Sequence, residues 1–77
     1  MADTVEIKLF ATLNRFLPAN PDRYPLSPGM TARDLIRRLA IPEAQAKLVF
    51  INGVKADPDT TLKPGQRIGI FPPVGGG

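Results

Sequence analysis

The fold is decided by the stretch TARDLIRRLAIPEAQAKLVFINGVK, residues 31–55, in which the apolar period changes from helical to extended. From Ala32 to Leu39 the apolar residues recur at i, i+3, i+4 and i+7, which is typical of an amphipathic helix. Thr31 stands at the N-cap position, and Asp34 follows three residues later as a capping-box partner. This half of the stretch therefore predicts one capped helix.

The second half of the stretch predicts a strand and its return. The helix is expected to end near Ala40, because Pro42 cannot continue it. The run Leu48–Ile51 is short, apolar and continuous, and it predicts a strand. Asn52-Gly53 is the strongest two-residue hairpin signal in the chain, so a return strand is expected directly after it.

Upstream of the helix, the alternation over residues 4–12 predicts a first strand. The residues on its core face, which are expected to pack against the helix, are Val5, Ile7 and Leu9. Residues 14–22 are rich in turn formers and predict a loop, which could open with a short helical turn. A brief second strand is expected over residues 23–27, at a sheet edge because Pro25 lacks an N–H.

Downstream of the hairpin, Asp57-Pro58-Asp59 and Pro64-Gly65 predict two turns, and residues 67–71 predict the final strand. The order is strand, strand, helix, strand, short strand, strand. It indicates an α+β fold in which one helix packs across one face of a mixed sheet. We expect one domain over residues 1–72 and a flexible glycine tail over residues 73–77.

The composition excludes several function classes. The 77 residues include no Cys and no His, which excludes disulfides, thiol or Ser-His nucleophiles and any His/Cys metal site. Ten Lys and Arg against seven Asp and Glu give a net charge of +3, but the cations are spread and few aromatics lie between them. This pattern argues against nucleic-acid binding. No apolar run is long enough to cross a bilayer, and the cytoplasm is the expected location.

The end of the chain is the candidate reactive element. Two prolines favour an extended course, and three glycines leave the chain narrow and free to bend. The carboxylate of Gly77 has no Cβ beside it, so it could enter a channel too narrow for other residues. The residues expected to thread such a channel are Pro72, Pro73, Val74, Gly75 and Gly76.

The stretch LKPGQRIGIFPPVGGG, residues 62–77, closely resembles the end of the molybdopterin synthase small subunit, a MoaD-like protein of the MoaD/ThiS family of ubiquitin-like sulfur carriers. The resemblance extends to a first strand like Ile7–Ala11, a Thr-capped helix and the Ile51-Asn52-Gly53 hairpin. It implies a β-grasp, ubiquitin-like fold. The chain departs from the family pattern at Gln66, where an acidic residue is usual, and in its basic charge.

The resemblance also implies a chemistry and a set of partners. An adenylating enzyme of the MoeB/ThiF type would use ATP to activate Gly77, and a persulfide sulfur donor would convert it to a thiocarboxylate. A MoaE-like large subunit would then use that sulfur on a pterin precursor in molybdenum cofactor biosynthesis. The chain would be a carrier, with no cofactor or metal bound to it and no catalysis of its own.

Other interpretations stay open at this level. The chain could carry sulfur for the thiamine thiazole or another pathway, modify lysines through an isopeptide bond, or be an interaction module with an inert tail. Phe10 and Phe71 fall on the polar side of their strands and are candidates for one patch that binds partners. The helix arginines Arg33, Arg37 and Arg38 are most simply a solvated face and a secondary candidate.

Overall fold

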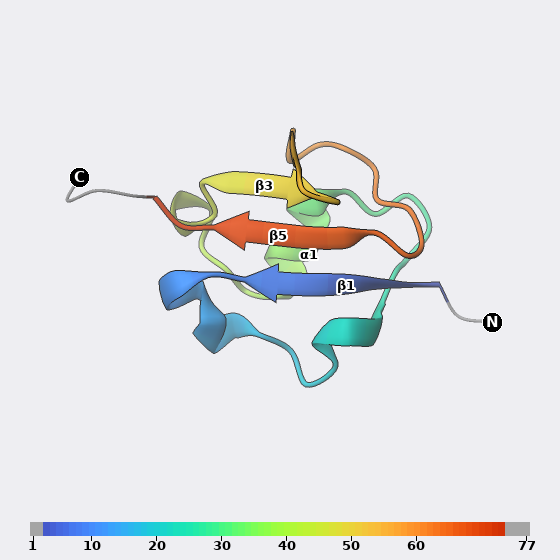
Figure 1. Cartoon of the computed structure of the whole chain (residues 1–77), viewed down its shortest axis with the longest axis horizontal. Coiled ribbons are helices and arrows are strands. Elements are labelled where there is room, and N and C mark those ends of the chain that lie inside the picture. The colour runs from blue at the N-terminus through green and yellow to red at the C-terminus, as the bar shows by residue number, and fades with distance from the viewer. Residues whose placement is uncertain (1–2, 74–77) are drawn as a thin grey trace.

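The computed structural model describes residues 3–73 as a mixed five-stranded sheet with an α-helix across one face (Figure 1). The strands are β1 (Thr4–Leu9), β2 (Tyr24–Pro25), β3 (Leu48–Ile51), β4 (Val54–Ala56) and β5 (Arg67–Phe71). The α-helix is α1 (Ala32–Arg38), and the connections contain the 3-10 helices η1 (Ala11–Phe16), η2 (Pro21–Arg23) and η3 (Glu43–Gln45). The predicted α+β class and the order of the strands and the α-helix are confirmed. No helix of this described part has the length and apolar character to cross a membrane.

The strand order β2-β1-β5-β3-β4 puts the last strand at the centre of the sheet. β5 pairs in parallel with β1 and antiparallel with β3, and the arrows of β1 and β5 point the same way in Figure 1. The C-terminal ends of these two strands therefore lie at the same end of the sheet. Phe10 follows β1 there, and Pro72 follows β5.

The core lies between α1 and the inner face of the sheet. The helix contributes the predicted apolar stripe, all of it buried: Ala32, Leu35, Ile36 and Leu39. The strands contribute Val5, Ile7, Leu9, Val49, Ile51, Ile68 and Ile70, which are also buried. The predicted core face of the helix and of the first strand is confirmed.

Helix α1 begins with the two reciprocal hydrogen bonds of a capping box. The Asp34 N–H donates to the Thr31 hydroxyl at 3.1 Å, and the Thr31 N–H donates to the Asp34 carboxylate at 3.0 Å. The predicted cap is therefore confirmed. The hydrogen bond from the Thr31 N–H, followed by the Thr31 hydroxyl and the charges of Arg37 and Arg38, holds the pKa of Asp34 below its usual range.

The cap predicts an acid-dependent loss of stability. Because the pKa of Asp34 is lowered on folding, its carboxylate stabilises the fold above the unfolded pKa of about 3.9 and loses that contribution as the pH falls through the folded pKa. We expect Asp34→Asn to lower the free energy of unfolding at neutral pH and to approach the native chain in acid. Urea unfolding at a series of pH values measures the difference. A difference that stays constant with pH would contradict a role for the charge.

The first strand is shorter than predicted. The alternation predicted a strand to Thr12, but β1 ends at Leu9 and η1 begins at Ala11, whose φ is 53°. A left-handed φ turns the chain out of the extended course. The turn brings Leu13 into the core with no exposed surface. The loop predicted over residues 14–22 does open with a helical turn, which is the end of η1, but the second turn, η2, was not predicted.

The edge strand and the hairpin are both present where Pro25 and Asn52-Gly53 predicted them. β2 covers only Tyr24–Pro25 of the predicted residues 23–27, and it lies at the sheet edge as Pro25 requires. Asn52 and Gly53 have φ values of 54° and 83°. Positive φ at both central residues is the geometry of a type I′ hairpin, so the predicted hairpin is confirmed.

Candidate functional site

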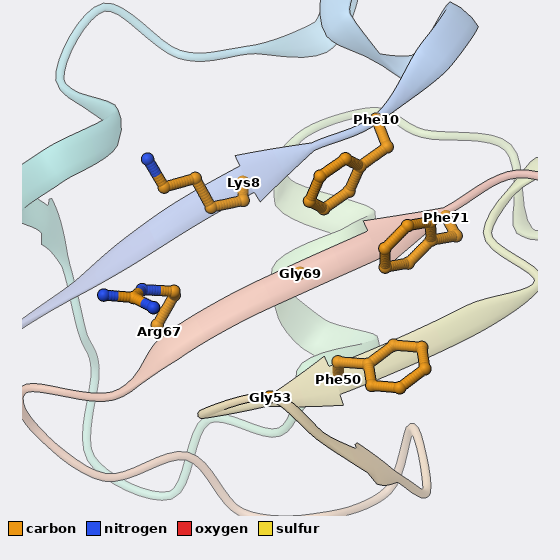
Figure 2. A pocket seen from close by; sticks show the side chains of 7 residues that line it. All are labelled: Lys8, Phe10, Phe50, Gly53, Arg67, Gly69 and Phe71. Atoms are coloured by element: carbon orange, nitrogen blue, oxygen red, sulfur yellow. The ribbon is translucent and has the colours of Figure 1, made fainter.

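The face of the sheet that points away from α1 carries the candidate site. Side chains alternate along a strand, so the neighbours of the core residues Ile68 and Ile70 point to this outer face. These neighbours on β5 are Arg67, Gly69 and Phe71. By the same alternation, β1 and the residue after it contribute Lys8 and Phe10, and β3 contributes Phe50 (Figure 2).

Three rings from adjacent chain segments form the aromatic cluster, which consists of Phe10, Phe50 and Phe71. The rings of Phe10 and Phe71 stack with centroids 4.1 Å apart and planes at 4°. The Phe50 ring meets Phe71 edge-on, with a centroid distance of 5.2 Å and an angle of 71°. Phe10 keeps 39% of its surface exposed. Phe50 and Phe71 are half-buried, so the cluster is a partly exposed apolar patch at the end of the sheet where β5 ends.

Gly69 forms the floor of a hollow beside the cluster. It is flanked across the sheet by Lys8 on β1 and Phe50 on β3. A Cβ on Gly69 would lie 3.4 Å from the Phe10 ring and 3.9 Å from the Phe71 ring. Because Gly69 has no side chain, the rings lean over it, and an open hollow of about 280 Å³ remains.

Charged side chains border the other end of this hollow. Figure 2 shows the three rings at one end, Lys8 and Arg67 at the other, and Gly69 between them. Lys8 Nζ lies 3.2 Å from Glu6 Oε2, and Arg67 Nε lies 3.6 Å from the same oxygen. The site is an apolar surface with a charged rim. It offers shape and charge for binding, and the ionisable side chains that line it, Lys8 and Arg67, both lie beside the Glu6 carboxylate.

The comparisons with known proteins agree with this geometry. A family model described as the ThiS family matches residues 7–77. The chain belongs to the ThiS family. It is therefore a sulfur carrier of the MoaD/ThiS kind. The proteins of this family are carriers rather than catalysts, and they work with partner enzymes.

A solved structure supports the fold of this ThiS-family carrier. It is a Pyrococcus furiosus protein described as a molybdopterin converting factor, subunit 1, and the match has a TM-score of 0.69 at 25% sequence identity. The match covers 95% of this chain and 100% of that chain. The expected β-grasp fold is confirmed. No protein of curated function gives a significant match.

The carrier brings together two of the predicted site residues. Phe10 and Phe71 were expected to be neighbours on the outer face, and their stacked rings are in contact. Their binding role stays a prediction. Phe50 was missed, because its apolar run was interpreted as a strand without a face being assigned to each residue. The alternation with the buried residues Val49 and Ile51 was the signal that could have found it.

The tail residues of the carrier are described only in part. Pro72 is half-buried and Pro73 is exposed, directly after β5. Val74, Gly75, Gly76 and Gly77 lie outside the described residues. The predicted threading of these residues, the reactive role of Gly77 and the boundary between residues 72 and 73 therefore stay predictions.

The arginine face of α1 serves the structure of the carrier. Arg33 donates to Asp59 at 2.8 Å and to Glu43 at 3.3 Å, which ties the helix to two connections. The hydrogen bond and the charge of Asp59 raise the pKa of Arg33 above its ordinary value. Arg37 lies 3.7 Å from Glu43, and Arg38 donates to the Ser27 hydroxyl at 3.0 Å. These contacts favour a solvated, structural role over a binding one.

Gln66 also has a local structural role. Its side-chain oxygen accepts a hydrogen bond from the Lys63 N–H at 2.7 Å, which closes the turn before β5. A carboxylate at this position could accept the same bond. The departure from the acidic residue that the family resemblance led us to expect therefore preserves the turn.

Proposed function

We propose that the Gly77 carboxylate of this carrier is adenylated and then converted to a thiocarboxylate, whose sulfur serves molybdopterin biosynthesis. The observation that carries the proposal is the family match, which continues through the terminal glycines to residue 77. Two features favour the molybdopterin pathway. They are the lead-in Phe71-Pro72-Pro73-Val74 before the glycines and the likeness to a molybdopterin converting factor subunit.

The chemistry requires activation because a carboxylate is a poor electrophile. Attack of the Gly77 carboxylate on the α-phosphorus of ATP releases pyrophosphate and forms an acyl-adenylate. The terminal sulfur of a persulfide donor then attacks the acyl carbon, and AMP leaves. A second thiol of the donor then attacks the donor's inner sulfur and cleaves the sulfur–sulfur bond that came from the persulfide, so that the donor ends as a disulfide and the carrier as a thiocarboxylate. ATP is used by the activating enzyme and is not a cofactor of the carrier.

The partners supply the catalytic groups. The chain has no His and no Cys, so the persulfide donor must provide the thiols, and the MoeB/ThiF-like activating enzyme and the MoaE-like large subunit would provide the acid and base groups that the chain lacks. The aromatic cluster lies at the end of the sheet where β5 continues to Pro72. A partner that holds the cluster would therefore receive the tail from a defined starting point. We propose that the activating enzyme and the large subunit share this surface.

Replacing Phe71 tests the shared surface. Phe71 contacts both other rings of the cluster, and its side chain lies outside the core, so Phe71→Ala should remove the patch and keep the fold. We expect the affinity for both partners to fall by about tenfold or more, as for a central aromatic of an interface. Isothermal titration calorimetry measures it, with circular dichroism as the check on folding. Unchanged affinity for both partners would mean that the cluster is not the docking surface.

A different sulfur pathway is the second candidate function, because the matching family model carries the ThiS name. The loaded carrier should transfer sulfur to a pterin precursor with a molybdopterin synthase large subunit, and a thiazole-pathway carrier should transfer it with a thiazole synthase instead. Side-by-side transfer assays with the two enzymes separate these pathways.

The state of the native protein tests carrier function itself. Intact mass of the protein isolated from its own cells distinguishes a thiocarboxylate, a lysine conjugate and an unmodified carboxylate. We expect a thiocarboxylate fraction. A chain found only in conjugates with other proteins would instead indicate a protein modifier.

A further inference from the structure

The rim of the hollow carries more positive than negative charge. A single oxygen, Glu6 Oε2, lies within 3.6 Å of both Lys8 Nζ and Arg67 Nε, so one carboxylate is shared between two cations. One positive charge of this group therefore remains uncompensated. Arg67 keeps 63% of its side chain exposed and Lys8 keeps 49%, so both can meet a partner.

The register of the sheet adds a third cation to the same face. Lys55 on β4 is paired with Phe50 on β3, and cross-strand partners project to the same side of a sheet. Lys55 is exposed. Within strands β1 to β5, the outer face therefore presents three cations, Lys8, Lys55 and Arg67, against Glu6 alone.

The occupant of this face is best identified as a protein. The Phe10 and Phe71 rings stack, so each covers one face of the other. Fewer ring faces are therefore left for the bases of a nucleic acid to stack upon. The rings instead form a compact apolar centre surrounded by charge, which is the anatomy of a protein interface. A partner with complementary charge would place carboxylates around an apolar centre of its own.

We propose that the aromatic cluster and its cationic rim bind a partner protein whose surface has an apolar centre flanked by Asp or Glu carboxylates. One partner carboxylate lies beside Lys8 and Arg67 and completes the charge pattern that Glu6 leaves open. The apolar centre holds the complex together, and the cations speed its formation. The inference rests on the proposed function in one respect, which is that the activating enzyme is such a partner.

The test measures association rates with the purified activating enzyme at low and high salt. Lys8→Glu and Arg67→Glu should each slow association by about three- to tenfold at low salt. The effect should fade near 1 M salt, where charges are screened beyond about 3 Å. Glu6→Gln should speed association by about two- to fivefold, because it leaves both cations without their shared carboxylate. A gain of this kind cannot come from damage to the fold.

The matched control is Arg37→Glu, which makes the same charge change on α1, across the sheet from the site. It should leave the association rate near that of the native chain, with only a weak long-range effect of net charge. An equal slowing by Arg37→Glu, or rates that do not respond to Lys8, Arg67 and Glu6, would overturn the inference. Binding to phosphatidylserine vesicles or single-stranded DNA as tight as binding to the enzyme would also overturn it, since the face would then recognise anions in general.

Sulfur loading in the same mixtures separates the two claims. If the native chain binds with the expected charge dependence and is never adenylated, the proposed function fails and the inference about the surface stands. If the native chain loads normally and the association rates do not change with the charge substitutions, the inference about the surface fails and the proposed function stands.

Discussion

Deleting Gly77 is expected to abolish sulfur loading while the fold stays intact. The deletion shortens the chain by one residue, at most about 3.3 to 3.6 Å, and leaves a new carboxylate on Gly76. That carboxylate has ordinary chemistry but falls short of the activating nucleotide. The loss should be at least about a hundredfold in the rate of ATP-dependent thiocarboxylate formation, because small errors in position cost that much in reactions set by proximity. Mass spectrometry of the reaction gives the rate.

Two further variants test separately the position of the terminal carboxylate and the narrowness of the tail. Gly76→Ala keeps the reach but adds a Cβ and restricts φ, so a narrow channel should reject it and an open surface would accept it. One residue appended after Gly77 keeps the glycines but moves the carboxylate, and should block loading unless a protease trims it. If all three variants load sulfur like the native chain, the tail is not the functional element and the interaction-module interpretation becomes the better one.

Leu35→Ala is expected to have the largest effect on stability. Leu35 has no exposed surface and lies on the buried stripe of α1, in the same core as Ile7 and Ile68. Removing a buried leucine side chain from a packed core costs about 2 to 5 kcal/mol. Small domains have only about 5 to 15 kcal/mol of stability in total, so this variant should be close to unfolding. Equilibrium urea unfolding measures the change.

Leu17→Ala is the matched control for the core. Leu17 has 40% of its surface exposed, so the same substitution should cost less than about 1 kcal/mol. A loss of only a few tenths of a kcal/mol for Leu35→Ala, or equal losses for both variants, would contradict the assigned core face.

Local chemistry explains why much of the fold could be predicted from the sequence. The helix stripe, the Thr31 cap and the Asn52-Gly53 hairpin each depend on residues a few positions apart, and each is present as predicted. The end of the first strand could not be predicted in this way. Nothing in the alternation marks Ala11 as left-handed, and Leu13 is buried by contacts with residues distant in sequence.

The candidate site was predictable to the extent that it follows strand periodicity. Alternation placed Phe10 and Phe71 on the outer face, and the family resemblance made their strands neighbours. Phe50 and the charged rim needed the register, because the lengths of the connections set which residues of β1, β3 and β5 lie side by side. The role of Gly69 also needed the register, since only the folded sheet places three phenylalanine side chains around it.

The central claim is tested most directly by locating the sulfur on the loaded chain. The carrier is incubated with activating enzyme, ATP and a persulfide donor, and its intact mass and fragments are measured. The account predicts an ATP-dependent mass increase equal to the exchange of one oxygen for one sulfur, confined to Gly77. The chain has no cysteine, so no side-chain thiol can hold a persulfide that imitates this result. An unmodified Gly77 in the presence of active enzyme and donor, or sulfur located anywhere else in the chain, would contradict it.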